Sequence, residues 1–363
     1  MKRIVEFDTA LATTNLGDEI ILRSLRQELA FLYRDAFIVR YGTHVKNFSA
    51  SNYYARLQKV AFAERADYKL IMGANLLSGD LKKSRLQWTV CGVNGWLYEN
   101  VILAGVGTTY GTGKITAYSR KVYNNILRQS FCHSVRDEES KRFLESMGFK
   151  AINTGCPTLW SLTPEFCQSI PHGKAGRAIF SLSGYREQRD VPNDRALIEV
   201  LKRNYGQLYF WCQTVMDETY LDSFKDLGVA DIPRVYSLEE YARLLDEGDI
   251  DYVGTRLHGG IMALQHGVRA IVISIDHRAQ GFHDSNNLAI CDRSRVGEDL
   301  EGMINSDFET RIDVDRDAID AWKAQFSRTD LPKNSNTYNK RPLVRATRWI
   351  AKYYKALVRR IEK

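Results

Sequence analysis

Short apolar runs alternate along this chain with longer segments whose apolar residues have helical spacing. The runs predict strands at residues 3–7, 36–40, 68–73 and 100–107, and a second series at 178–185, 208–213, 250–254 and 270–275. Strands that alternate with amphipathic helices are typical of parallel α/β sheets. A polar segment at 168–176 separates the two series. We therefore expect an N-terminal domain at 1–167 and a C-terminal domain at 177–330.

The run from residue 250 to residue 275 combines a strand, a helix and a second strand. Ile261 and Leu264 mark the apolar stripe of the helix, and Arg256 and His258 fall at its start. In an open parallel sheet, ligands bind beyond the carboxyl ends of the strands, where helix N-termini present N–H groups to anions. An always-charged donor beside a group that titrates near neutrality suits a small anion that is held while a proton moves. On these residues alone, His258 as a structural helix cap is an equally good interpretation.

Three segments resemble the motifs of the polysaccharide pyruvyltransferase family. They are NLGDEIIL at Asn15–Leu22, SVRDEESKRFLESMGF at Ser134–Phe149, and the segment from Thr255 to Phe282 that contains Arg-Leu-His. They occur in the family's order. Two positions depart from the family's pattern: Arg269 stands where proline is usual, and Arg278 stands where lysine is common. We expect Arg269 to change only the start of the strand that follows it.

This resemblance implies both a fold and a reaction. The fold is α/β, with two Rossmann-like domains facing a cleft in a GT-B-like arrangement. The reaction transfers pyruvate from phosphoenolpyruvate to two hydroxyls of one sugar, giving a cyclic ketal and free phosphate. Phosphoenolpyruvate is then a co-substrate, and neither a cofactor nor a metal ion is expected. The N-terminal domain would hold the acceptor and the C-terminal domain phosphoenolpyruvate.

The resemblance also assigns residues to the phosphoenolpyruvate side. The substrate carries a carboxylate and a phosphate, and arginine can bind either group through two hydrogen bonds. We expect Arg136 of one domain and Arg256 of the other to clamp the substrate, with Leu257 beside them. Arg278 is a further candidate, although it could instead pair with Asp276 or Asp284. His258 is expected to transfer a proton, to the enol carbon or to the leaving phosphate.

On the acceptor side, the resemblance points to the loop at residues 15–19. Asn15, Gly17 and Glu19 would contact the sugar, and Asp18 would act as base. A turn with a helix cap is the structural alternative for this loop, and we expect Asp137 to cap the mid-chain helix. His266 and His283 are expected to be structural, and His277 is a secondary candidate.

Composition favours an intracellular enzyme. The six cysteines are scattered without a C-x-x-C pair or a His/Cys cluster, which argues against a disulfide framework or a zinc site and fits a reducing cytoplasm. No signal peptide is expected, because the N-terminal segment becomes polar before an apolar stretch accumulates. No stretch approaches the length that a bilayer span requires.

The last 24 residues hold the basic excess of the chain. Residues 340–363 contain nine Lys/Arg and one acidic residue, a net charge of +8, whereas the whole chain carries +7. At helical spacing, aliphatic and aromatic residues fall on one face and most cations on the other, the pattern of a basic amphipathic helix on an anionic membrane surface. A helix packed on its own protein is an alternative, and nucleic acid is a less favoured partner.

We therefore interpret the chain as a cytoplasmic pyruvyltransferase that is peripheral on the inner face of the cytoplasmic membrane. Its acceptor would be a lipid-linked saccharide precursor of a surface polysaccharide. One alternative is a GT-B glycosyltransferase that uses a nucleotide sugar, since fold does not decide function. Another is a non-catalytic subunit that tethers a polysaccharide-assembly complex to the membrane.

Overall fold

The computed structural model describes residues 1–45, 47, 58–83, 88–91, 94–109, 113–328, 330 and 332–333. They form two compact units. Unit 1 contains Met1–Ala12, Leu25–Pro157 and the chain from Asp315 onward, and unit 2 contains Thr13–Ser24 and Thr158–Val314. The helix predicted on the membrane at 340–363 lies outside the described residues. Within the described part, no helix is long and apolar enough to span a membrane.

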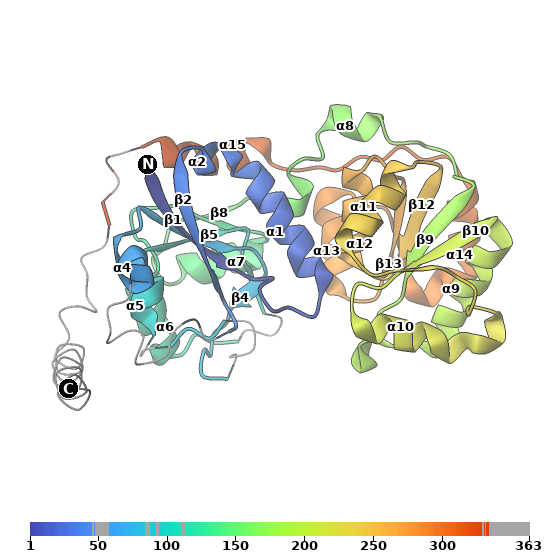
Figure 1. Cartoon of the computed structure of the whole chain (residues 1–363), viewed down its shortest axis with the longest axis horizontal. Helices are drawn as coiled ribbons and strands as arrows, with labels where there is room; N and C mark the ends of the chain where they lie inside the picture. The colour runs from blue at the N-terminus through green and yellow to red at the C-terminus, as the bar shows by residue number, and fades with distance from the viewer. Residues whose placement is uncertain are drawn as a thin grey trace, which may run out of the picture. The chain divides into compact units, whose positions relative to one another are not determined.

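The sheet of unit 1 has four parallel strands in the order β2-β1-β3-β5. Its strands β1 and β2 lie side by side in Figure 1. The strands are β1 (Lys2–Asp8), β2 (Ala36–Gly42), β3 (Tyr68–Met72) and β5 (Val101–Ala104). Two short parallel pairs follow, β4 (Asn75–Leu77) with β6 (Gly107–Thr108) and β7 (His133–Val135) with β8 (Ala151–Asn153). The helices are α1 (Leu16–Glu28), which runs from unit 2 into unit 1, α2 (Ala30–Tyr33), α4 (Gln58–Arg65), α5 (Gly95–Tyr98), α6 (Ala117–Ile126), α7 (Glu138–Glu145) and α15 (Arg316–Ala324).

The sheet of unit 2 has six parallel strands in the order β11-β10-β9-β12-β13-β14. They are β9 (Arg177–Ser181), β10 (Gln207–Trp211), β11 (Arg234–Val235), β12 (Ile250–Gly254), β13 (Ala270–Ser274) and β14 (Ile290–Asp292). Its further helices are α8 (Pro164–Gln168), α9 (Val191–Asn204), α10 (Val215–Leu221), α11 (Leu238–Asp246), α12 (Leu257–Gln265), α13 (His277–Asn286) and α14 (Val296–Asn305). From β9 the chain winds outward in one direction, and from β12 in the other. The strand order therefore reverses between β9 and β12, which is where open α/β sheets bind ligands.

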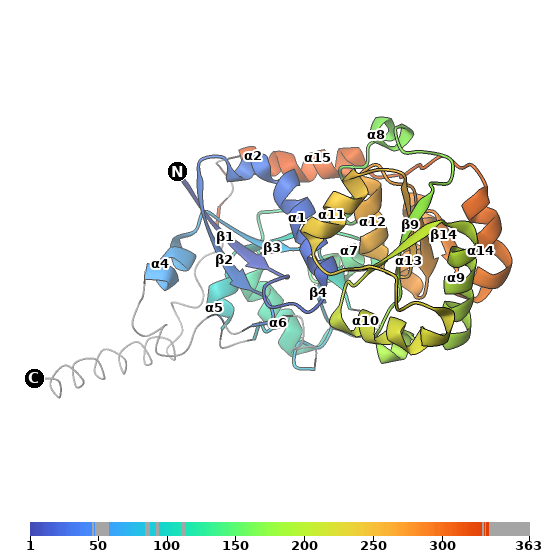
Figure 2. The same cartoon turned by 45° about the vertical axis from the view of Figure 1, so that its right-hand side comes forward.

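Both faces of this six-stranded sheet are covered by helices. Phe180, Val253 and Ile271 belong to a core that includes α9 and α14, which lie side by side in both views (Figures 1 and 2). Helix α12 packs on the opposite face, where a Cβ on Gly260 would lie only 2.7 Å from Val272 and 2.9 Å from Tyr252. Because Gly260 has no side chain, α12 can begin close against the sheet.

The predicted strands are present, with two differences in extent. The strand predicted at 100–107 divides into β5 and β6, because Gly105 between them has a φ of 64°. The strand predicted at 178–185 ends at Ser181, since the chain then turns toward α10, where the Gly184 N–H donates to Asp217 at 2.9 Å.

The domain boundaries differ from those predicted. Residues 315–328 belong to unit 1, because α15 packs there: Trp322 donates to the Cys132 carbonyl at 3.1 Å, and Lys323 pairs with Glu28 at 2.5 Å. Residues 13–24 belong to unit 2, where the Leu16 N–H donates to the carbonyl of Gln213 at 3.0 Å. The division in mid-chain falls after Pro157 rather than in the polar segment at 168–176.

Candidate functional site

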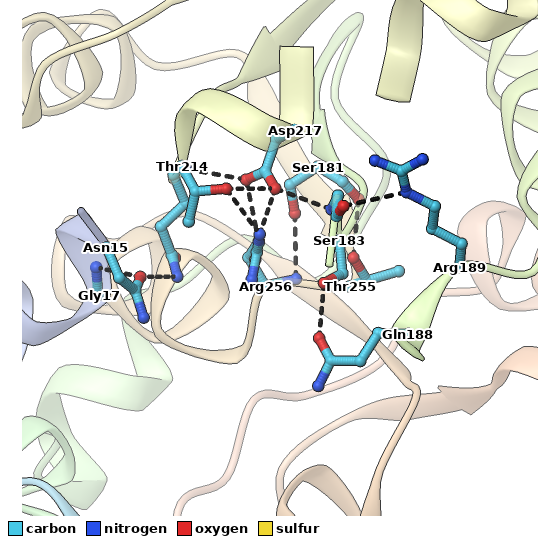
Figure 3. Close-up of polar contacts among 12 residues, drawn as sticks. Asn15, Gly17, Ser181, Ser183, Gln188, Arg189, Thr214, Asp217, Thr255 and Arg256 are labelled. Carbon is cyan, nitrogen blue, oxygen red and sulfur yellow. Dashed lines mark hydrogen bonds and ion pairs between the residues drawn. The ribbon is translucent and has the colours of Figure 1, made fainter. Parts of the chain in front are cut away.

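Arg256 lies at the carboxyl end of β12 and is the N-cap of α12. Its backbone N–H donates to Ser181 Oγ at 3.1 Å, and its carbonyl accepts from the Tyr252 hydroxyl at 2.7 Å. The side chain is only 6% exposed. Its Nε donates to Asp217 Oδ2 at 3.0 Å, and its Nη2 donates to Asp217 Oδ1 and, at 3.1 Å, to Thr214 Oγ1 (Figure 3). The guanidinium is therefore held inside unit 2 by a bidentate ion pair.

Asp217 connects the loops that follow three neighbouring strands. Its buried carboxylate accepts from the Gly184 N–H at 2.9 Å, in the loop after β9. It also accepts from the Thr214 hydroxyl at 2.8 Å and from the Thr214 backbone N–H at 3.0 Å. The bond from the backbone N–H is one half of a capping box at the start of α10. With Arg256 after β12, these contacts bind the loops of β9, β10 and β12 to one side chain (Figure 3).

Tyr185 covers the face of the Arg256 guanidinium. The Arg256 Cζ atom lies 4.7 Å from the centre of its ring, within the range of a cation–π interaction. Burial raises the pKa of the Tyr185 phenol. The positive charge of Arg256 lowers this pKa, and the carboxylates of Asp217 and Asp18 raise it further.

Leu257 and His258 are the first two residues of α12, and both are half-buried. A Cβ on the next residue, Gly259, would lie 3.1 Å from Trp211 and 3.2 Å from the Tyr252 hydroxyl, so the helix starts tightly against β10 and β12. The Arg-Leu-His segment therefore lies at the carboxyl edge of the sheet, as its sequence predicted. Its roles in binding and proton transfer stay predictions.

The loop at residues 15–19 belongs to unit 2 and not, as predicted, to the domain formed by the first strands. Asn15 Oδ1 accepts from the Gly17 N–H at 3.0 Å and from Gln213 Nε2 at 2.8 Å. A Cβ on Gly17 would come within 2.8 Å of that same Nε2, so a larger residue would displace the Gln213 side chain. Asn15 and Gly17 thus fasten the start of α1 to the end of β10, and their contact with an acceptor stays a prediction.

The two carboxylates of this loop have partners within unit 2. Asp18 Oδ2 accepts from the Thr13 hydroxyl at 2.7 Å, and the residue is half-buried. Glu19 pairs with Arg23, one turn along α1, at 3.2 Å, and Arg23 also pairs with Glu239 at 2.5 Å. The role of Asp18 as base and the contact of Glu19 with a sugar stay predictions.

Arg278 pairs with Asp276, one of the two partners that the sequence offered. Its Nε and Nη2 donate to Asp276 Oδ2 at 3.0 and 2.6 Å, while the other oxygen of Asp276 caps α13. Both histidines that are expected to be structural have a partner within unit 2: His266 Nδ1 lies 2.7 Å from Asp246 Oδ1, and His283 Nδ1 lies 2.8 Å from the carbonyl of Leu288. No group of three His, Cys, Asp or Glu residues among those described is arranged to hold a metal ion.

Arg136 follows β7 in unit 1. Its side chain is 14% exposed and its Nε lies 3.3 Å from Asp137 Oδ2. A Cβ on Gly107 would come within 2.3 Å of that Nε. Asn75 of β4 pairs with Gly107 of β6. The buried Oδ1 of Asn75 has no hydrogen bond. Asp137 caps α7 by accepting from the Ser140 N–H at 2.7 Å, as predicted. The clamp between Arg136 and Arg256 joins residues of different units and stays a prediction.

Sequence reasoning missed Asp217, Thr214 and Tyr185. One signal could have found two of them, because Thr214-x-x-Asp217 directly after a predicted strand is a capping-box pattern. Nothing in the local sequence announces that the same carboxylate holds Arg256, 39 residues further along the chain.

Comparison of solved structures identifies the fold. The UDP-GlcNAc 2-epimerase of Methanocaldococcus jannaschii, in complex with UDP-GlcNAc and UDP, has a TM-score of 0.51 and 13% identity, covering 90% of this chain and 99% of that chain. The E. coli heptosyltransferase WaaC, with ADP-2-deoxy-2-fluoro heptose, has a TM-score of 0.39 and 13% identity, covering 80% and 92%. The predicted class, a parallel α/β fold of GT-B type, is confirmed.

Among curated proteins, no relative of the chain is found. The family model described as polysaccharide pyruvyl transferase matches residues 15–277, which include all three motif segments except the last residues of the third. This match covers more than half of the sequence. The chain belongs to the polysaccharide pyruvyl transferase family.

Proposed function

We propose that this transferase moves pyruvate from phosphoenolpyruvate onto two hydroxyls of one sugar. The methylene carbon of the enol gains a proton, and the first sugar hydroxyl adds to the neighbouring carbon. The bond from that carbon to the phosphate oxygen breaks, and the second hydroxyl adds in its place. Of the two hydroxyl protons, one balances the new methyl group and the other leaves with phosphate. The product is a cyclic pyruvate ketal.

The observation that supports this proposal is the position of Arg256, Leu257 and His258. They lie at the start of α12, at the point in the unit 2 sheet where the strand order reverses. The positive end of the helix dipole favours an anion at the start of α12. His258 can move a proton near neutral pH, and Asp18 can accept one from a sugar hydroxyl.

The ion pair with Asp217 limits what Arg256 contributes. Its positive charge is balanced by a buried carboxylate, so it offers a ligand directed N–H groups rather than net charge. The charge of phosphoenolpyruvate must then be met by further groups. We assign this role mainly to the start of α12 and to His258 when protonated, because Arg278 is paired with Asp276 and Arg136 with Asp137.

We further propose that the acceptor is a lipid-linked saccharide and that the enzyme works at the inner face of the cytoplasmic membrane. The support is the net charge of +8 in residues 340–363 and the amphipathic pattern of that segment. The same pattern would keep the site near an acceptor anchored in the membrane.

Ligand protection followed by turnover tests the reaction. The melting temperature of the intact protein is measured with phosphoenolpyruvate and, separately, with a series of UDP-, GDP- and ADP-sugars, because a ligand that binds only the folded state stabilises it. Phosphate release from phosphoenolpyruvate is then measured with p-nitrophenyl glycosides of common hexoses. Protection by phosphoenolpyruvate and glycoside-dependent phosphate release support the proposal. Protection by a nucleotide sugar alone, with no phosphate release, contradicts it and favours a glycosyltransferase.

A further inference from the structure

Two perpendicular sets of contacts fix the guanidinium of Arg256. Asp217 and Thr214 hold the edge formed by Nε and Nη2 (Figure 3). The Tyr185 ring covers one face. An arginine side chain otherwise loses rotamer entropy when a ligand immobilises it. Here that cost is met during folding, before any ligand arrives. The edge formed by Nη1 is the one that Asp217 does not occupy.

A buried ion pair adds little stability by itself, because both charges lose their hydration and well-packed apolar residues of similar volume are often as stable. The geometry that the pair imposes is then its main effect. Asp217 has 0% exposure and is satisfied by donors from Gly184, Thr214 and Arg256. These contacts give the loops after three strands, and the arginine between them, a single geometry.

We propose that Asp217 is a positioning residue that sets both the direction and the effective charge of Arg256 toward the anionic substrate. This inference rests on the proposed function. By balancing the positive charge, Asp217 makes binding depend on directed hydrogen bonds from Arg256 and not on general attraction of anions. A misplacement of about 1 Å in such a group can reduce turnover on the order of 10²-fold.

The test compares Asp217→Asn with Asp251→Asn in the full-length protein. Asp251 is a matched control, because it also forms a buried ion pair with arginine, Arg269 at 3.0 Å, but at the amino ends of strands of the same sheet. We expect Asp217→Asn to lower kcat per folded molecule by about 10- to 100-fold. The KM for phosphoenolpyruvate should not rise, and it should become more sensitive to salt, since an uncompensated arginine attracts anions through a screened interaction. Asp251→Asn should lower the melting temperature and leave these kinetic values unchanged.

Substitutions of Thr214 provide a milder second test, which holds even if Asp217→Asn does not fold. Thr214→Val removes the hydroxyl that accepts from Arg256 and donates to Asp217, whereas Thr214→Ser keeps it. We expect several-fold loss of kcat in the valine variant and recovery in the serine variant. Wild-type kinetics in folded Asp217→Asn, or in Thr214→Val, would overturn the inference while leaving the reaction in place. Absence of phosphoenolpyruvate turnover in the wild type would overturn the proposed function and this inference with it.

Discussion

Arg269 and Asp251 form an ion pair of 3.0 Å in which the two side chains are only 1% and 3% exposed. The second terminal nitrogen of Arg269 donates to the carbonyls of Met303, Ile304 and Ser306 at 2.8–3.1 Å, at the end of α14. Asp251 also accepts from the Tyr205 hydroxyl at 2.7 Å. The sequence position of Arg269 suggested that it changes only the start of β13. In the structure it also joins β12, β13 and the end of α14.

Replacing Arg269 with methionine should destabilise the protein by about 3–5 kcal/mol, because it leaves the Asp251 charge buried without its partner. The free energy of unfolding in urea measures this effect. Turnover per folded molecule should stay at the wild-type value, since the pair lies at the amino ends of the strands. The double variant Arg269→Met/Asp251→Leu should recover part of the loss. A loss below about 1 kcal/mol in the single variant would show that the pair is not coupled to folding.

His258→Ala should reduce turnover by at least about two orders of magnitude, the usual contribution of general acid–base catalysis. The matched control is His266→Ala, because His266 lies at the other end of α12 and contacts Asp246. The control should keep nearly full activity. Phosphate release from phosphoenolpyruvate measures both variants, and circular dichroism checks that they are folded. Full activity in a folded His258→Ala protein would remove His258 from the mechanism.

The sequence was most informative where a local pattern carries the structure. Alternating apolar runs predicted the strands, and the helix start at Arg256 and His258 followed from residues that are neighbours in the chain. Asp137 was recognised as a cap for the same reason, because its partner is Ser140, three residues away.

What the sequence did not predict depends on contacts between distant segments. Residues 13–24 belong to unit 2 because Leu16 contacts Gln213. Residues 315–328 belong to unit 1 because Trp322 contacts Cys132. The partnership of Asp217 with Arg256 is of the same kind. Hydrophobic periodicity carries no information about such pairs, since it reports only which face of an element is buried.

Gly107→Ala should weaken the binding of phosphoenolpyruvate through Arg136. The added methyl group would come within 2.3 Å of the Arg136 Nε, so the guanidinium would have to move. Arg136→Lys should have a similar effect, because an ammonium cannot form the paired hydrogen bonds of a guanidinium. Titration with phosphoenolpyruvate measures both. Gly302→Ala is the control, since a Cβ there meets nothing within 4 Å. If both variants bind phosphoenolpyruvate with unchanged affinity, the substrate does not depend on Arg136. Arg278 would then be the next cation to test.

Deleting residues 340–363 should separate membrane binding from chemistry. The segment holds the basic excess of the chain and none of the motif residues. The shortened protein should turn over a soluble glycoside but no longer sediment with vesicles that contain anionic lipid. Binding of the intact protein should fall with salt, because the screening length shortens from about 10 Å at 0.1 M to about 3 Å at 1 M.

The control for the deletion keeps the charge of the tail and removes its apolar face, by changing Leu343, Ile350 and Leu357 to serine. Membrane binding by an amphipathic helix requires both the charge and the apolar face, so this variant should also bind vesicles weakly. If the deletion unfolds the protein, the apolar face of the tail packs on the protein itself and the membrane interpretation is wrong.

His133 should make the protein less stable in mild acid. The ring is fully buried in β7, where its Nδ1 accepts from the Leu103 N–H at 3.2 Å, and burial lowers the pKa of His133 from 6.5 to about 4. As the pH falls below 6.5, the unfolded chain therefore takes up a proton that the folded protein does not. The contribution of His133 to the free energy of unfolding is fully present above pH 6.5 and is lost as the pH falls toward 4. The loss is about 1.4 kcal/mol per pH unit and about 3 kcal/mol in total.

The measurement is the free energy of unfolding in urea between pH 7 and pH 4, in the wild type and in His133→Asn. Asparagine keeps an acceptor for the Leu103 N–H but does not titrate, so the variant should start less stable at pH 7 and lose less as the pH falls. Other groups titrate in the same range, which makes the difference between the two curves the quantity to compare. His283→Asn, at an exposed histidine of α13, should follow the slope of the wild type. Parallel curves for the wild type and His133→Asn would mean that the buried ring is protonated as readily in the folded state as in the unfolded chain.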